Sequence, residues 1–330
     1  MIRSLQIVNP LPQALLHYEE TLREILNELG VEVREASGSA SSIEELNGTQ
    51  KIATTLRMIW TRLTTVKGSS ALLVIWPALG YWDAQTWARA AKTRKIFLVM
   101  HDITPLRAQF GYSKLAMRRF ASVINKSNIV VICHSRIAAD ELYSLTGITS
   151  TVLDHPISLS SKPVGVSSKT LRVLGQYKET RSLESLRLVR DDLADHEATV
   201  ALEIKGRGWP PVDGWSVDSR FLSESEFTEA IASSNCVLLP YSRFYQSGVA
   251  VRCLESGVPV VAHSSEQMTQ LYGDGWPGIA NDDKDWGRAV LATLAISHTR
   301  MGELLAAARE SCVTSWANGL TVETSTVSDG

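Results

Sequence analysis

The sequence lacks several features that define other classes of protein. Its four cysteines, Cys133, Cys236, Cys253 and Cys312, are scattered and form no Cys-x-x-Cys pair, so neither a disulfide framework nor a zinc site is indicated. It contains no Walker loop. The formal net charge of −2 gives no reason to expect nucleic-acid binding. This cysteine usage is consistent with a reducing compartment.

Long hydrophobic runs are also missing. The longest apolar stretch, Ala71 to Trp82, contains a proline and a glycine, whereas a membrane-spanning helix needs about 20 apolar residues. Residues Met1 to Val8 have the pattern of a short strand, and the helix predicted after them carries charges, so no secretory signal is indicated. We therefore expect a cytoplasmic protein, with at most peripheral contact at the inner face of a membrane.

The 330 residues, 44% of them hydrophobic and 21% charged, are sufficient for two globular domains. Apolar runs that predict buried strands alternate with segments of helical periodicity along the whole chain. In the first half, strands are predicted at 4–10, 31–34, 71–76, 95–100, 128–133 and 151–153, and helices at 13–29, 49–66, 83–92, 112–125 and 135–145. This alternation predicts an α/β fold with two Rossmann-like, doubly wound domains that face a cleft.

A serine-rich segment, Ser158 to Ser168, interrupts the alternation and contains Pro163 and Gly165. Such a segment without apolar periodicity is typical of a linker. We predict domains at residues 1–160 and 169–312, a linker at 161–168, and a C-terminal segment at 313–330. The threonines and serines of that last segment suggest that any helix in it is short.

The stretch from Cys236 to Ser264 is predicted as a strand, a polar turn, a helix and a second strand. The turn places Ser247 and Gly248 at the N-terminus of the helix. Free N–H groups and the positive end of the helix dipole make such a position suitable for an anion. The alternative is that Ser247 is an ordinary N-cap residue.

A second polar stretch, Leu174 to Arg181, follows a predicted strand. It contains Gly175, Gln176 and two basic residues, Lys178 and Arg181. Basic side chains there could neutralise a pyrophosphate and stabilise it as a leaving group. The alternative is a solvated basic loop.

Both stretches resemble motifs of family-4-like GT-B glycosyltransferases, above all a bacterial subgroup with GQxRPYK and PYR…SG motifs. Residues 174–181, LGQYKETR, are similar to FGQIRPYKG, with Lys178 on its arginine and Arg181 on its lysine. The second motif is matched by Pro240-Tyr241-Ser242-Arg243, Ser247-Gly248 and Gly257-Val258-Pro259-Val260. Glu255 matches the second of two glutamates that many such enzymes carry eight positions apart.

The resemblance implies that residues 169–312 bind a nucleotide sugar and that residues 1–160 bind the acceptor, with the last segment crossing back to the first domain. The donor, most simply a UDP- or GDP-sugar, would be a co-substrate, with no further cofactor and no metal. The residues implied to bind it are Gly175, Gln176, Lys178, Arg181, Tyr241, Ser247, Gly248 and Glu255.

His101 and Asp102 directly follow a predicted strand, where the sequence resembles the TVHN motif of the same enzymes. In an inverting transfer, either side chain could accept the proton of the acceptor hydroxyl. In a retaining transfer the donor phosphate could do so, and His101 would contact the sugar. Asp102 could equally be a cap or turn residue. His134-Ser135 and His155-Pro156 are weaker matches to VHS and IPHG.

The segment Tyr112 to Lys126 combines four basic residues with helically spaced apolar residues. A basic amphipathic helix can lie on anionic lipid. The alternative is a helix that faces the core and carries a solvated basic face.

The resemblance implies a metal-independent hexosyltransferase that moves a sugar from a nucleotide-diphosphate sugar to a glycan, lipid-linked or other small acceptor. Polysaccharide or cell-envelope glycan synthesis is the usual setting of the subgroup. Two alternatives remain. Ile75-Trp76-Pro77 resembles the end of the HLHWP motif without its histidines, and Leu106 stands at the second histidine of TVHNLxPH. These missing histidines favour a non-catalytic GT-B-like partner subunit. A nucleotide-sugar epimerase would share a related two-domain fold.

Overall fold

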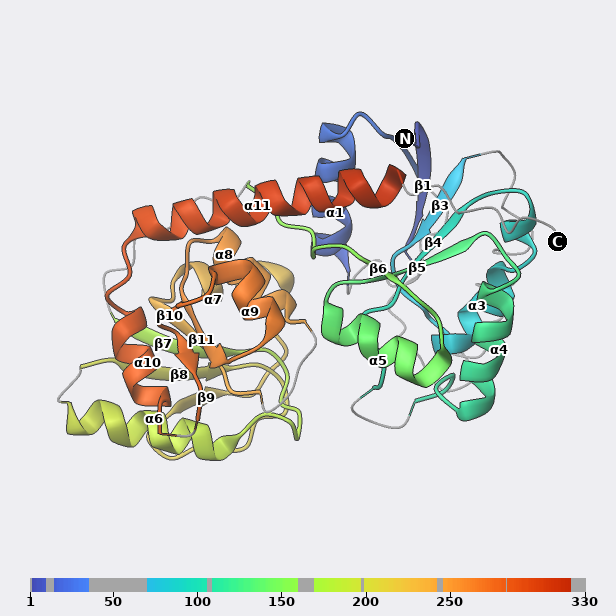
Figure 1. Ribbon diagram of the computed structural model, residues 1–330. Coiled ribbons are helices and arrows are strands. Elements are labelled where there is room, and N and C mark those ends of the chain that lie inside the picture. Colours follow the sequence, from blue (N-terminus) through green and yellow to red (C-terminus); the bar gives the residue numbers. More distant parts are fainter. Residues whose placement is uncertain are drawn as a thin grey trace. The chain divides into compact units, whose positions relative to one another are not determined.

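The computed structural model describes residues 2–9, 15–35, 70–105, 109–159, 169–196, 199–241, 246–282 and 284–321. Contacts divide the chain into two compact units, Met1–Pro156 with Cys312–Gly330, and Ile157–Ser311 (Figure 1). Each unit is built on a six-stranded parallel sheet. The helix predicted at 49–66, the linker predicted at 161–168 and residues 322–330 of the predicted tail lie outside the described residues.

The sheet of the first unit has the strand order β2-β1-β3-β4-β5-β6. Its strands are β1 Ser4–Val8, β2 Glu32–Glu35, β3 Ala71–Val74, β4 Ile96–Val99, β5 Ile129–Cys133 and β6 Thr151–Val152. Its helical segments are α1 Leu16–Glu28, η2 Gly80–Trp82, α3 Asp83–Trp87, η3 Ala90–Lys92, α4 Lys114–Ile124 and α5 Arg136–Thr146. Every residue of β3 and β4 is buried, because helices cover both faces of the sheet (Figure 1).

The sheet of the second unit has the order β12-β11-β10-β7-β8-β9. Its strands are β7 Thr170–Leu174, β8 Ala201–Lys205, β9 Ser216–Asp218, β10 Cys236–Leu239, β11 Val260–His263 and β12 Ile279–Ala280. Its helices are α6 Leu183–Asp195, α7 Glu224–Ala232, α8 Gly248–Glu255, α9 Glu266–Tyr272, α10 Trp286–Thr293 and the first part of α11 His298–Thr321. Side chains of α6 and α10 share one hydrophobic cluster with the sheet, and those of α7, α8 and α9 share another.

The strand order reverses in the middle of this second sheet. From β7 the chain continues outward to β8 and β9, and it then returns to β10 on the other side of β7. Leu171 of β7 pairs with Cys236 of β10, so the carboxyl ends of these two strands are neighbours. Open parallel sheets bind ligands at such a topological switch point.

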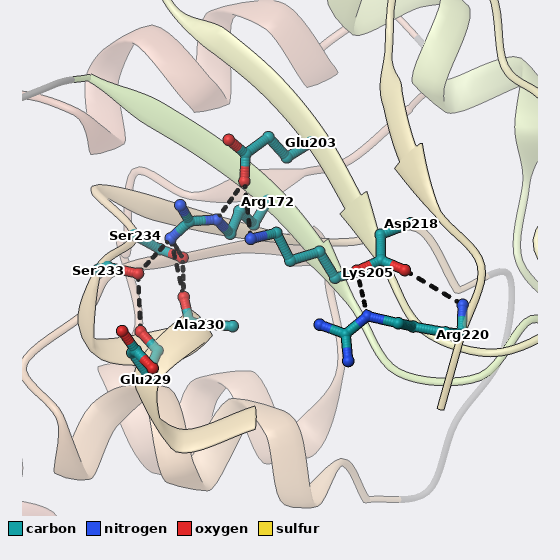
Figure 2. A network of polar contacts seen from close by, with 9 residues as sticks. All are labelled: Arg172, Glu203, Lys205, Asp218, Arg220, Glu229, Ala230, Ser233 and Ser234. Atoms are coloured by element: carbon teal, nitrogen blue, oxygen red, sulfur yellow. Dashed lines mark hydrogen bonds and ion pairs between the residues drawn. The ribbon is translucent and has the colours of Figure 1, made fainter. Parts of the chain in front are cut away.

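A buried arginine ties β7 to β8 and α7. Arg172 donates to the Glu203 carboxylate at 2.7 Å, and Lys205 Nζ lies 3.4 Å from the same oxygen (Figure 2). A single nitrogen of Arg172 also reaches the Ala230 carbonyl and the hydroxyls of Ser233 and Ser234. Because the cation meets the negative end of the α7 dipole as well as a carboxylate, its burial is compensated.

The C-terminal segment differs from the prediction. Residues 298–321 form one continuous helix of 24 residues, α11, instead of ending in a short helix after residue 313. Cys312, Trp316 and Leu320 recur every four residues and are buried in the core of the first unit. This apolar spacing outweighs the helix-weakening effect of the threonines and serines. The short strands β9 and β12 were also not predicted.

Candidate functional site

The loops that follow β7 and β8 are in direct backbone contact. The Gly175 N–H donates to the Lys205 carbonyl at 2.9 Å, and the Gly175 carbonyl accepts from the Trp209 indole at 2.8 Å. Gly206 has a φ of +149°, and a Cβ at this position would lie 2.2 Å from the Gly175 oxygen. Only glycine fits there, so the two loops can approach each other closely. The loops that follow β7 and β8 thus form one rigid edge at the switch point, which we call the rim.

Arg181 is the central charge at this rim. Its guanidinium covers Gly175, because a Cβ on that glycine would lie 3.0 Å from Nη2. Nη1 donates to the Leu174 carbonyl at 2.9 Å and Nη2 donates to the Tyr241 hydroxyl at 2.6 Å. The charge also lies 4.7 Å from the Tyr241 ring centre and 5.3 Å from that of Trp209. An isolated bridge between Arg181 and Tyr241 fixes the two backbones.

No carboxylate compensates this cation within the described part of the chain. Arg181 is only 4% exposed, and its Nε has no hydrogen-bond partner there. Burial lowers the pKa of the guanidinium, although the neighbouring Tyr241 opposes that shift. A buried charge held only by neutral groups is costly, and an anionic ligand would compensate it. Arg181 therefore differs from Arg172, whose charge is neutralised inside the protein.

The N-terminus of α8 supplies a second feature suited to anions. Ser247 is the N-cap of this helix, and its Oγ accepts from the Ala250 N–H at 3.3 Å. The N–H groups of Gly248 and Val249 precede that capped position and have no acceptor in the described ranges. Gly248 is exposed, with no atom within 4 Å of where its Cβ would be. Ser247 is thus an N-cap, as the alternative interpretation stated, and Gly248 leaves the helix dipole open to a ligand.

The other predicted donor residues occupy different places. Gln176 and Lys178 are exposed in the loop after β7. Tyr241 belongs to the Arg181 cluster. Glu255, however, is the last residue of α8, and its Oε1 accepts from the Ser158 N–H at 2.7 Å. It lies about 10 Å along the helix axis from Gly248, so the structure does not bring it to the α8 N-terminus.

Arg207 is a site residue that the sequence interpretation missed. It is exposed at the carboxyl end of β8, between Gly206 and Gly208. Its carbonyl accepts from the Tyr177 N–H at 2.9 Å, which fixes its backbone against the β7 loop. The sequence could have indicated it, because Arg207 is a basic residue between two glycines directly after a predicted strand. Arg207 and Lys178 are thus exposed cations on the two loops, where Glu179 is also exposed.

In the first unit, the predicted residue His101 lies in a cluster of buried rings. It stacks on Trp76, and its ring centre is 5.1 Å from Tyr18 and 5.4 Å from His134. His134 contacts His155 in turn, at 5.3 Å between ring centres. The weak motif matches at His134 and His155 thus meet at the carboxyl ends of β4, β5 and β6. Tyr18 of α1, at the centre of the cluster, was not predicted.

Hydrogen bonds determine the tautomers of the two most buried histidines, and burial favours the neutral form of both rings. His101 Nε2 lies 2.9 Å from the Ile75 carbonyl and therefore carries the hydrogen. His134 Nδ1 donates to the Leu153 carbonyl at 2.8 Å, and its Nε2 then accepts from the Tyr18 hydroxyl at 2.9 Å. Burial, with a smaller effect from His155, lowers the pKa of His101 to about 3. Burial and both neighbouring histidines hold the pKa of His134 well below 6.5.

The two predicted catalytic residues are therefore not equivalent. His101 is buried and its Nε2–H is committed to a backbone carbonyl. Asp102, one residue further from β4, is exposed. Of these two side chains only the Asp102 carboxylate is open to solvent, so it is better suited to accept a proton from a substrate.

Comparison with known proteins supports one conclusion about the fold. No protein-family model and no curated protein matches the chain. Among solved structures, the chain is similar to TarM, with 14% identity, a TM-score of 0.59, and coverage of 80% of this chain and 57% of TarM. The chain thus spans little more than half the length of TarM.

The matches to two trehalose-phosphate synthases cover nearly the full length of both chains. The UDP-forming enzyme from Burkholderia vietnamiensis has 11% identity and a TM-score of 0.64, over 97% of this chain and 96% of that one. The enzyme from Burkholderia xenovorans, solved with glucose-6-phosphate, has 11% identity and a TM-score of 0.63, over 96% and 98%. With two parallel-sheet α/β units, the chain has the GT-B fold of these glycosyltransferases.

Proposed function

We propose that this protein is a glycosyltransferase that moves a sugar from a nucleotide-diphosphate sugar to an acceptor. The donor would be a UDP- or GDP-sugar, bound by the second unit. The acceptor, a glycan, a lipid-linked glycan or another small molecule, would bind to the first unit. We place the reaction in polysaccharide or cell-envelope glycan synthesis and propose that it needs no metal, because cationic side chains and a helix N-terminus can stabilise the departing diphosphate.

The uncompensated charge of Arg181 carries this proposal. It lies at the switch point of a parallel sheet, beside Gly175 and Tyr241. Lys178 and Arg207 are exposed at the same sheet edge. Helix α8 begins after β10, and the N–H groups of Gly248 and Val249 have no acceptor among the described residues. A diphosphate has the charge and the acceptor oxygens that such a group of donors requires.

Nucleotide binding tests the proposal directly. We expect UDP or GDP to raise the thermal midpoint of the purified protein, since a ligand at a hundredfold excess over its Kd stabilises the folded state by about 2.7 kcal/mol. UMP or GMP should stabilise less, because each lacks the additional charge and the acceptor oxygens of the second phosphate. If UDP, GDP, ADP and dTDP at millimolar concentration all leave the midpoint unchanged, the proposal is wrong.

A second part of the proposal concerns α4, which would contact an anionic membrane surface. Ala116 and Phe120 are the buried residues of this helix. Lys114, Arg118, Arg119 and Lys126 are exposed, and none has an ion-pair partner within the described ranges. Phe110 and Leu115 beside them are 76% and 57% exposed. No helix in the part of the chain that the structure describes has the length and apolar character to cross a bilayer.

Vesicle binding tests this contact. We expect the protein to bind vesicles with 30% phosphatidylglycerol and not those of phosphatidylcholine alone. Replacing Lys114, Arg118 and Arg119 by glutamine should weaken binding about 100-fold, because each cation near such a surface contributes about 1 kcal/mol. The matched control replaces Arg187, Arg288 and Arg300, exposed arginines with acidic partners. Equal losses for both triple variants would refute a role for α4.

A further inference from the structure

One side chain of α9 holds the backbone of Ser247 at two points. The Ser247 N–H donates to Gln267 Oε1 at 2.6 Å, and Gln267 Nε2 lies 3.4 Å from the Ser247 carbonyl. Gln267 is 3% exposed and Ser247 6%. Because the amide meets both the donor and the acceptor of one residue, it imitates a strand partner and fixes the orientation of that peptide.

These two contacts with Gln267 determine which N–H groups at the α8 N-terminus remain available. Ser247 uses its own N–H on Gln267, its Oγ on the Ala250 N–H, and its carbonyl on the Val251 N–H at 3.3 Å. The N–H groups of Gly248 and Val249 are left at the open end of the helix. If Ser247 could rotate, its hydroxyl would leave Ala250 and the first turn would lose its alignment.

The other end of α9 contacts the same turn. The Tyr272 hydroxyl donates to the Ala250 carbonyl at 3.1 Å, and Tyr272 is buried among apolar side chains. Gln267 and Tyr272 lie at opposite ends of a seven-residue helix. Two polar groups of α9 therefore hold the first turn of α8 from outside the rim itself.

We propose that Gln267 is a positioning residue for the diphosphate of the donor. It holds Ser247 so that the Gly248 and Val249 N–H groups stay directed toward the phosphate oxygens, and Tyr272 assists through Ala250. The inference rests on the proposed function, since it concerns the same anion-binding edge. Gln267 need not touch the ligand, and its effect is confined to the phosphate end of the nucleotide.

The test compares ligands with and without phosphates. In Gln267→Met, which keeps the side-chain length and removes both hydrogen bonds, we expect the Kd for UDP to rise about tenfold. The Kd for uridine should stay within twofold of wild type, because the nucleoside does not use the helix N-terminus. Tyr272→Phe should raise the Kd for UDP about threefold, again without changing uridine binding. If the guanine series is preferred, GDP and guanosine replace these probes.

Gln270→Met is the matched control, since Gln270 is exposed on the same helix, and it should leave both constants unchanged. If Gln267→Met does not fold, Tyr272→Phe replaces it, because this change removes one hydroxyl and keeps the ring. The change in the Kd for UDP relative to that for uridine then decides the question. Unchanged UDP affinity in the folded variants, or equal losses for UDP and uridine, would overturn the role of Gln267. A wild-type protein that binds none of UDP, GDP, ADP and dTDP would overturn the proposed function and this inference together.

Discussion

Replacing Arg181 by methionine should weaken UDP or GDP binding about 100-fold, which corresponds to about 2.7 kcal/mol. Methionine keeps most of the side-chain volume but removes the charge that no carboxylate neutralises in the described part of the chain. The diphosphate would then lose the buried cation that we propose for its site. Isothermal titration with the preferred nucleotide measures the loss directly.

The stability of the ligand-free protein separates this role from a structural one. Removing a buried charge without a counter-ion should leave the thermal midpoint of Arg181→Met unchanged or higher. Arg181→Lys should lie between wild type and Arg181→Met, because lysine keeps the charge and lacks the guanidinium fork. Arg187→Met, on the exposed side of α6, is the control. Wild-type affinity in Arg181→Met would exclude Arg181 from the site.

The first unit should lose about 4 kcal/mol of stability between pH 7 and pH 5. His101 and His134 are buried as neutral rings, and their pKa values in the folded state lie below the ordinary 6.5. Below pH 6.5 the unfolded chain binds protons that the folded chain does not, so stability falls as the pH falls. The loss continues toward pH 3, where His101 becomes protonated in the folded state. Each histidine contributes about 2 kcal/mol at pH 5.

Hydrogen exchange of the β4 and β5 amides measures the free energy of opening of the first unit, and therefore its stability at each pH. His134→Gln can still donate to Leu153 and accept from Tyr18, and it should halve the difference between pH 7 and pH 5. His298→Gln replaces an exposed histidine in the second unit and should leave the difference intact. Equal opening free energies at both pH values in wild type would show that the buried ring cluster does not resist protonation.

The sheets were predictable because their central strands are continuous apolar runs. Ala71–Val74 and Ile96–Val99 are buried on both faces. Continuous apolar runs such as ALLV and IFLV are typical of buried strands in parallel sheets. The strands β9 and β12 have only three and two residues, too few to show a period. Their existence depends on neighbours that are distant in the sequence.

The site was predictable in its location and not in its electrostatics. Lys178 and Arg181 are three residues apart in one polar loop and are indistinguishable by sequence, yet one is exposed and the other buried between Tyr241 and Trp209. That difference arises from the fold of three separate loops. The assignment of Glu255 rested on a spacing of eight residues, and an intervening helix of eight residues places it at the far end.

The contact between the β7 and β8 loops also indicates where this protein can change during evolution. Gly206 cannot gain a side chain without displacing the Gly175 carbonyl, so lineages that diverge here must conserve it. Arg207, between Gly206 and Gly208, is exposed at the same rim and its backbone is already fixed. Exchange of this single side chain would therefore change the charge of the rim while the loop that carries it keeps its shape.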